Sequence, residues 1–146
     1  MLDIPENLHP AVAQSLTTWH DMVERADLKA LESIVHPEAT FRSPMSINPY
    51  APAEALVMAL STVITVFENL TYHRQFASDD GLNVVLEFSA DVGDRSVKGI
   101  DMIRFDEQGL ITDFEVMIRP FNGLQALGAA MAARIGDKLP SFKVRK

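Results

Sequence analysis

The sequence predicts an α+β fold in which helices come first and an antiparallel sheet follows. Apolar residues recur with a helical period of about 3.6 up to Asn69 and with a period of two after it. The turn signals DDG, GDR and DEQG separate the later alternating segments, which is typical of consecutive hairpins. No repeat or linker divides the sequence, so its 146 residues are expected to form one domain, residues 1–146.

The helical part is expected to contain three helices. Residues 10–25 form the first, whose apolar residues are Val12, Leu16, Trp19 and Val23. Asp27 is typical of an N-cap and predicts a short second helix, which ends before Pro37. Pro52 is expected to open the third helix, and a further helix near the C-terminus is expected to stop at Gly136.

Four strands are predicted in the segments LTYHRQFA, LNVVLEFSADV, VKGIDMIRF and LITDFEVMIRP. Alternation assigns to one face of the last three strands Leu82, Val84, Leu86, Phe88, Ala90, Val97, Gly99, Ile103, Phe105, Leu110, Phe114, Val116 and Ile118. The opposite face mixes charged residues with Ile100, Met102 and Met117, which a freely solvated face has less reason to hold. We therefore expect a homodimer that forms through this outer sheet face, although scattered exposed apolar residues are the simpler alternative.

Composition excludes several classes of function. The 13 basic and 20 acidic residues give a net charge of −7, which opposes binding to nucleic acid or to anionic lipid. The absence of cysteine excludes disulfides and thiolate chemistry. No His, Asp and Glu set has metal-ligand spacing and no glycine-rich phosphate loop is present, so no metal and no cofactor are predicted. The segment MLDIPENLHP lacks the features of a signal peptide and no apolar run approaches about 20 residues, so a cytoplasmic protein without membrane association is expected.

Asp101 is the residue that points most directly to chemistry. Alternation places its carboxyl on the same face as Val97, Ile103 and Phe105, where a strand normally buries apolar side chains. An unpaired carboxylate in such a place costs several kcal/mol, so it must accept hydrogen bonds or become protonated. A structural aspartate held by its neighbours and a functional acid both fit this pattern.

The order of elements and two sequence blocks resemble the NTF2-like superfamily, and within it the SnoaL-like and ketosteroid isomerase branch. The blocks are ADLKALESIVHPEATFRSP and GIDMIRFDEQGLITDFEVMIRP. The resemblance covers nearly the whole chain and implies a cone-shaped α+β barrel, in which N-terminal helices and a curved sheet enclose a deep pocket. The superfamily includes isomerases, polyketide cyclases, epoxide hydrolases and non-catalytic domains, so the fold does not settle the chemistry.

The resemblance assigns roles to three positions. In ketosteroid isomerases the strand reads Asp-x-x-Arg-Phe, and DMIRF places Asp101 on the carboxyl that donates a hydrogen bond to an enolate oxygen. The companion donor is a helix-one tyrosine in the isomerases and Trp19 here, and the general base is an aspartate before proline there and Ser43 here. A serine hydroxyl has far too high a pKa to carry a proton between carbons, so steroid-type double-bond isomerisation is disfavoured. The Arg-x-Asp pattern of the epoxide hydrolases is absent from LEFSADV.

With Trp19 in the same pocket, Asp101 has two candidate states. It accepts from the indole as a carboxylate, or it presents its own proton to a ligand oxygen. The pocket is expected to be lined by Trp19, Ser43, Met45, Phe67, Leu86, Phe88, Ile103, Phe114 and Val116. His73 and Arg74 lie on opposite faces of the first strand, and the sequence leaves open which of them reaches the pocket, while His20 is expected to leave the pocket face.

The sequence thus predicts a homodimer that binds a hydrophobic, carbonyl-bearing small molecule. Cofactor-free acid/base chemistry at Asp101, of the polyketide cyclase or isomerase kind, is the enzymatic hypothesis. The alternatives are a non-catalytic binding module with the same pocket and a dimeric scaffold whose cone is filled by side chains.

Overall fold

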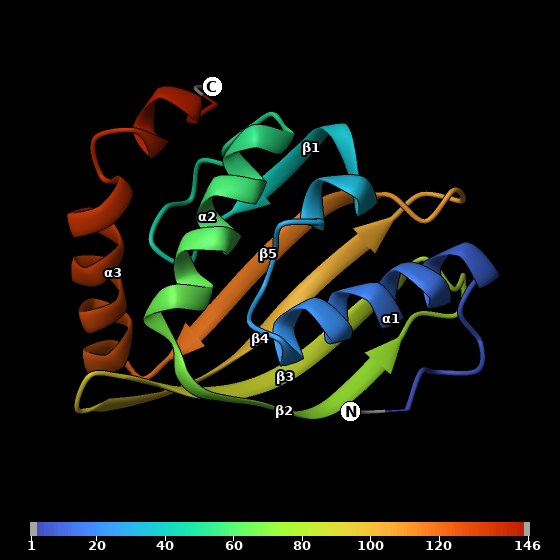
Figure 1. Ribbon diagram of the computed structural model, residues 1–146, viewed down its shortest axis with the longest axis horizontal. Helices are drawn as coiled ribbons and strands as arrows, with labels where there is room; N and C mark the ends of the chain where they lie inside the picture. The colour runs from blue at the N-terminus through green and yellow to red at the C-terminus, as the bar shows by residue number, and fades with distance from the viewer. Residues whose placement is uncertain (1–2, 145–146) are drawn as a thin grey trace.

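The computed structural model describes residues 3–144, which form a single curved sheet with its helices on one side (Figure 1). The helices are α1 (Pro10–Glu24), α2 (Ala53–Val66) and α3 (Phe121–Ile135), and two short 3₁₀ helices are η1 (Leu31–Ile34) and η2 (Leu139–Phe142). The strands are β1 (Val35–Arg42), β2 (Glu68–Ala77), β3 (Asn83–Val92), β4 (Arg95–Phe105) and β5 (Ile111–Arg119). The predicted α+β arrangement is therefore confirmed.

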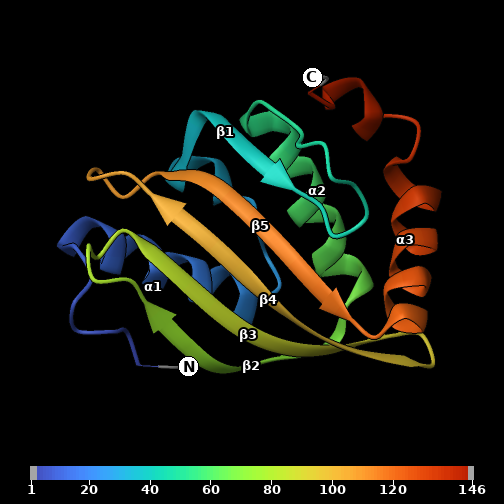
Figure 2. The same ribbon diagram turned by 180° about the vertical axis from the view of Figure 1, so that it is seen from behind.

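The sheet has the strand order β1-β5-β4-β3-β2, so β1 and β2 are its edges. Strands β2 to β5 form the predicted antiparallel meander through three hairpin connections. Seen from behind, the sheet lies in front of α1 and α2 (Figure 2). The face that these helices cover is the concave one.

The segment after Asp27 differs from the prediction of a short second helix. Only Leu31–Ile34 are helical, as the 3₁₀ turn η1, and the chain then enters β1. Strand β1 pairs with β5 in parallel, so the sheet is mixed and has five strands. Proline is compatible with an edge strand, because the N–H it lacks would face away from the ladder, and Pro37 lies in such a strand.

The predicted alternation on β3 and β4 is confirmed. Val84, Leu86, Phe88 and Ala90 are buried on β3, as are Val97, Ile103 and Phe105 on β4. On β5 the prediction fails at one residue, because a register shift after Arg104 pairs Phe105 with Ile111. Ile111 is consequently fully buried, whereas Leu110 lies before the strand and is half-buried.

Helix α3 covers the end of the sheet opposite to α1 (Figure 1). It ends at Gly136 as predicted, and Leu127 and Ile135 are buried. Gly123 allows the start of the helix to approach β4, because a Cβ there would lie 2.5 Å from Val97 Cγ1.

Candidate active site

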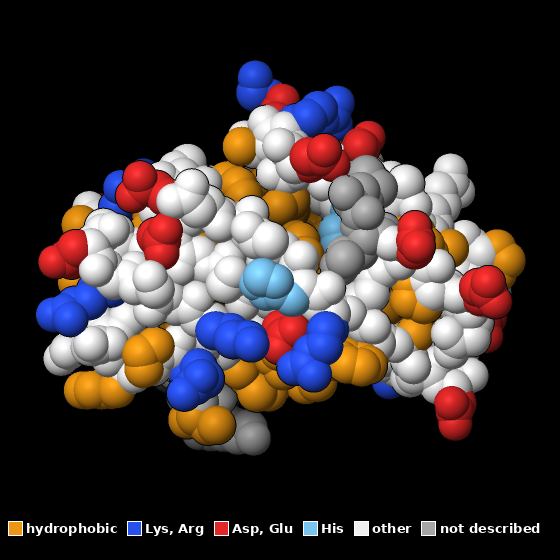
Figure 3. Space-filling model, turned by 90° about the horizontal axis from the view of Figure 1, so that it is seen from below, with side chains coloured by type: hydrophobic (Ala, Val, Ile, Leu, Met, Phe, Trp, Pro, Cys, Tyr) orange, Lys and Arg blue, Asp and Glu red, His pale blue; other side chains and the backbone are white. Residues whose placement is uncertain are grey.

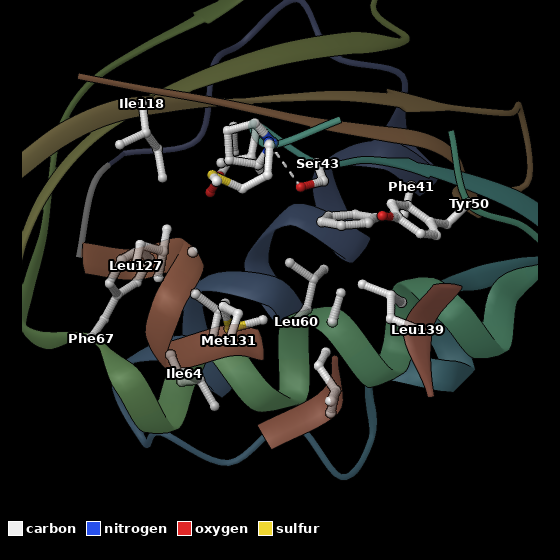
Figure 4. A pocket seen from close by; sticks show the side chains of 18 of the residues that line it. Phe41, Ser43, Tyr50, Leu60, Ile64, Phe67, Ile118, Leu127, Met131 and Leu139 are labelled. Atoms are coloured by element: carbon white, nitrogen blue, oxygen red, sulfur yellow. Dashed lines mark hydrogen bonds between the residues drawn. The ribbon is translucent and has the colours of Figure 1, made fainter. Parts of the chain in front are cut away.

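An apolar cavity with a volume of about 230 Å³ lies between the concave face and the helices. Helix α2 contributes Leu60 and Ile64, and α3 contributes Leu127 and Met131 (Figure 4). Tyr50 and Phe41 lie together at one side of the cavity, and Phe67 and Leu127 lie at the other (Figure 4). Few side chains that line this space carry polar atoms: Trp19, Ser43, Tyr50, Tyr72 and Asp101.

Asp101 faces the cavity from the middle of β4. It pairs with Leu86 on β3 and Val116 on β5, and its relative exposure is 7%. Both neighbours are buried and apolar, so the strand register alone places the carboxyl in an apolar wall. The predicted inward orientation of Asp101 is what the structure shows.

A chain of two hydrogen bonds ends on this carboxyl. Trp19 Nε1 donates to Tyr72 Oη over 3.2 Å, and Tyr72 Oη donates to Asp101 Oδ2 over 2.9 Å. An indole can only donate, so the single proton of the tyrosine is directed toward Asp101. Trp19 therefore acts on Asp101 through Tyr72. The sequence suggested a direct hydrogen bond from the indole to Asp101, and the structure has Tyr72 between them.

The second carboxyl oxygen of Asp101 remains available. Among residues 3–144, no side chain or backbone group donates to Oδ1. Every described side-chain oxygen that is sealed from solvent has a hydrogen-bond partner. Oδ1 has none, so it must retain accessible surface. Because Asp101 lines the cavity, this oxygen opens onto it.

Burial raises the pKa of Asp101 to about 7, and the hydrogen bond from Tyr72 opposes the rise. Burial is also the main reason that the pKa of Tyr72 lies well above its ordinary value, and the nearby Asp101 raises it further. Tyr72 therefore keeps its proton at neutral pH, whereas Asp101 is close to half-protonated. Since Oδ2 accepts from Tyr72, the proton of neutral Asp101 belongs on Oδ1, facing the cavity.

Tyr72 is the functional side chain that sequence reasoning missed. Its strand has a register shift between Tyr72, paired with Phe88, and Gln75, paired with Leu86. This bulge turns both His73 and Arg74 outward, where His73 contacts Ser89 and Arg74 contacts Glu87. Neither reaches the cavity. The parity of Leu70 and Tyr72 before the bulge was a usable signal, because both residues line the cavity.

His20 lies behind Tyr72 and is not part of the cavity wall. As expected, it does not line the cavity. Its side chain is nevertheless buried, with an exposure of 5%. Its ring meets the edge of Tyr72 at 5.2 Å, and Nε2 lies 3.2 Å from Gln75 Oε1. The Gln75 amide also donates to the carbonyl of Asp3, so Oε1 is the acceptor and His20 Nε2 carries the proton.

Most of the predicted lining residues contribute to the cavity, namely Trp19, Ser43, Met45, Phe67, Phe88 and Val116, and the predicted catalytic residue Asp101 lines it as well. Leu86, Ile103 and Phe114 do not line it, although all three are fully buried. The ring of Phe114 packs edge-on against Trp19 at 5.3 Å, so the helix covers this part of the sheet directly. Alternation gives the face of a residue, but only the position of α1 decides whether space remains above it.

The loop after β1 closes one side of the cavity. Ser43 Oγ accepts a hydrogen bond from the backbone N–H of Met45 at 3.0 Å, which leaves the hydroxyl proton of Ser43 uncommitted. The side chain of Met45 reaches Gly128 on α3, where an added Cβ would lie 2.6 Å from Met45 Cε. The loop and α3 therefore meet through a methionine in a glycine notch.

The described part of the chain contains neither a helix long and apolar enough to cross a membrane nor a cluster of three or more potential metal ligands.

A curved, open sheet whose concave face and helices enclose an apolar cavity with one buried carboxyl defines an NTF2-like protein. The chain belongs to the SnoaL-like domain family, whose sequence pattern matches residues 16–114. The comparison with curated protein sequences gives no significant match.

Solved structures extend this assignment over nearly the whole chain. A steroid delta-isomerase from Pseudomonas aeruginosa is 54% identical, with 94% of this chain and 99% of that chain covered and a TM-score of 0.88. An uncharacterised bacterial protein with a cystatin-like fold from Silicibacter pomeroyi is 27% identical over 92% of each chain, with a TM-score of 0.80. An NTF2-like protein of unknown function from Mesorhizobium loti is 18% identical over 80% of this chain and 97% of that chain, with a TM-score of 0.67, which supports the fold alone.

Proposed function

We propose that the protein binds a hydrophobic, carbonyl-bearing small molecule in the cavity and acts on it through Asp101. The observation that carries this proposal is the hydrogen-bond chain from Trp19 through Tyr72 to Asp101, whose free oxygen opens onto an apolar space. Such a cavity, with few polar groups fixed in orientation, is typical of a small-molecule site.

Asp101 can serve as the proton donor at neutral pH. With a pKa of about 7, a large share of the protein holds a proton on this carboxyl, and a general acid or base is most effective near the working pH. A hydrogen bond from Oδ1 to a ligand carbonyl stabilises the negative charge that develops on that oxygen when an enolate forms or a nucleophile adds. The fixed donor from Tyr72 then stabilises the carboxylate that remains.

The lining of the cavity limits the reactions that fit. Asp101 is the only carboxyl among the described lining residues, and these include no histidine or lysine. A steroid delta-isomerase is 54% identical to this chain, which supports an apolar ketone as ligand. With Ser43 at the expected base position, however, double-bond isomerisation lacks a carboxylate to move the proton, and polarisation of a carbonyl, as in cyclisation or keto–enol chemistry, is the better match.

A non-catalytic binding module is the second candidate. The lack of a second carboxyl, or of a histidine or lysine, in the described cavity wall favours it, because most proton transfers between carbons use two groups or one mobile base. A scaffold with a filled cone is less well supported, because about 230 Å³ remains open.

The proposal is tested by screening apolar ketones for thermal stabilisation of the wild type. A ligand that prefers the folded state raises the unfolding temperature by mass action. Any ketone found is then assayed for turnover with Asp101→Asn, which keeps an acceptor for Tyr72 but removes the titrating proton. Binding without turnover in the wild type supports the binding module, and turnover that is unchanged in this variant contradicts the role of Asp101. A complete lack of stabilising ketones contradicts both candidates.

We also propose that two copies associate through the outer face of the sheet. Phe76 and Met117 are 56% and 43% exposed there. Beside them Arg74 and Lys98 both pair with Glu87, whose pKa falls to about 2, mainly through the hydrogen bonds from Arg74. Figure 3 shows basic side chains gathered around an acidic one, with hydrophobic side chains next to them.

A second copy fits this face because a two-fold interface must be complementary to itself. The groove around Glu87 is lined by the cationic residues Arg74, Lys98 and Arg119, whereas β5 carries Glu115 on the same face, beside Asp113, which pairs with Arg42. One copy can therefore offer the carboxylate of Glu115 to the basic groove of the other.

A further inference from the structure

The hydroxyl of Tyr50 is a buried polar group that the chemistry at Asp101 does not use. Tyr50 is 7% exposed and lines the cavity. Its hydroxyl makes no hydrogen bond within residues 3–144. Every side-chain oxygen in that range that is sealed from solvent has a partner, so the hydroxyl of Tyr50 must retain accessible surface. The hydroxyl therefore opens onto the cavity with its hydrogen-bonding capacity unused.

The ring of Tyr50 is held firmly, so the hydroxyl has a defined position. The backbone of Tyr50 exchanges two hydrogen bonds of 2.8 Å with Phe41. Its ring lies 6.4 Å from the ring of Phe41, and Lys143 Nζ lies 5.7 Å from its centroid. An apolar side chain could fill the same place, so a polar group at this position calls for an explanation.

Tyr50 and Asp101 lie far apart across the sheet. Tyr50 bridges to Phe41 on β1, Phe41 pairs with Phe114 on β5, and β5 pairs with β4, which carries Asp101. Three strand spacings separate the two backbones, or about 14 Å along the sheet. Between their backbones the cavity wall is mostly apolar, so the two side chains reach one apolar space from different sides.

We propose that the ligand carries two oxygen functions, a carbonyl that meets Asp101 and a second oxygen, at its far end, that accepts a hydrogen bond from Tyr50. This inference rests on the proposed function and narrows the ligand to rigid, elongated apolar molecules with an oxygen at each end. Tyr50 would then select the ligand and set its direction of entry, while Asp101 acts on the carbonyl.

The two tyrosines of the chain provide a matched experiment. The probes are 4-acetylbiphenyl, which has the carbonyl only, and 4-acetyl-4′-hydroxybiphenyl, which adds an oxygen at the opposite end. Binding of both to the wild type, Tyr50→Phe and Tyr72→Phe is measured by isothermal titration calorimetry. Circular dichroism and the unfolding temperature of each free variant check that it is folded.

The hydroxylated probe is expected to bind the wild type about fivefold more tightly than the other, which is the usual effect of one hydrogen bond. Tyr50→Phe is expected to remove this preference. Tyr72→Phe is expected to change the affinity for both probes by the same factor and therefore to keep the preference. Equal binding of the two probes to the wild type, or a preference that survives Tyr50→Phe, overturns the role of Tyr50 and leaves the proposed function standing. Failure of both probes to bind overturns the ligand class together with that function.

Discussion

Asp101 should make the stability of the protein depend on pH. Burial raises its pKa from the ordinary value of 3.8 to about 7, so the native state keeps a proton that the unfolded chain releases between about pH 4 and 7. The free energy of unfolding therefore falls as the pH rises through this window, by at most about 4 kcal/mol. Asp101→Asn is expected to match the wild type near pH 4 and to exceed its stability above pH 7.

Urea denaturation of both proteins at several pH values measures this difference. Contributions from other carboxyls cancel in the comparison. Glu87, whose pKa is lowered to about 2, acts in the opposite direction and at lower pH, because stability from a lowered pKa is lost as the pH falls. A wild type and a variant with parallel pH profiles would show that Asp101 is not buried as described.

Tyr72 should hold the pKa of Asp101 lower than burial alone would. Its hydroxyl donates to Oδ2 over 2.9 Å, and a hydrogen bond to a charged group contributes about 1.5–3 kcal/mol. Tyr72→Phe is therefore expected to raise the pKa of Asp101 further, as followed by carboxyl ¹³C NMR. Tyr50→Phe is the control, since Tyr50 makes no hydrogen bond to Asp101 and should leave the titration in place. An unchanged pKa of Asp101 in Tyr72→Phe would refute the role of the hydrogen-bond chain from Trp19 through Tyr72.

The sequence predicts Asp101 but not Tyr72 for a physical reason. Strand β4 keeps a regular register from Arg95 to Arg104, so counting by two places Asp101 correctly. Strand β2 contains a bulge after Tyr72, and counting by two through it assigns His73 and Arg74 to opposite faces although both point outward. The hydrogen-bond partner of a buried carboxyl can be identified only when the register between the strands is known. The residue pattern of a single strand does not contain this register.

Among the elements, α3 offers a matched pair of glycines. At Gly123 a Cβ would lie 2.5 Å from Val97 Cγ1 and 3.0 Å from the backbone oxygen of Ser96, neither of which moves without shifting the helix from the sheet. At Gly128 the obstacle is the flexible end of Met45. Gly123→Ala is expected to lower the free energy of unfolding by about 1–3 kcal/mol. Gly128→Ala is expected to leave it unchanged or to raise it by up to about 1 kcal/mol, through the better helix propensity of alanine.

Urea denaturation of the two variants under identical conditions distinguishes these effects. The same substitution in the same helix should have opposite signs at the two positions. The absence of a loss at Gly123 would mean that helix α3 is not docked on β4 as the structure has it, and a loss at Gly128 would mean that Met45 does not yield.

Strand β1 shows which elements the sequence could not predict. The helices and the meander follow from local signals, namely apolar period, caps and short turns. The parallel pairing of β1 with β5 joins segments about 70 residues apart, as Arg42 with Glu115, and no turn marks it. From the local sequence alone, Pro37 indicates the end of an element of secondary structure. It is compatible with strand β1 only because β1 is an edge strand.

At the scale of the whole molecule, the proposed dimer depends on the outer face of the sheet. The chain carries a net charge of −7, yet Arg74, Lys98 and Arg119 gather around one groove of that face. Repulsion between two acidic molecules is therefore weakest where basic groups of one can meet acidic groups of the other. The partly exposed Met117 lies in the same groove and would be covered in the dimer.

Met117→Lys is expected to disrupt the proposed dimer and leave a monomer. It replaces an apolar contact by a charge beside Lys98 and Arg119, and in a two-fold interface every such change occurs twice. Light scattering at micromolar concentration should give about twice the chain mass of 16.2 kDa for the wild type and about the chain mass for the variant. Ile47→Lys is the control, because Ile47 is 96% exposed on the loop after β1, away from the sheet face, and should leave the dimer intact. A monomeric wild type would refute the interface directly, and a dimer that persists in Met117→Lys would place the association elsewhere on the surface.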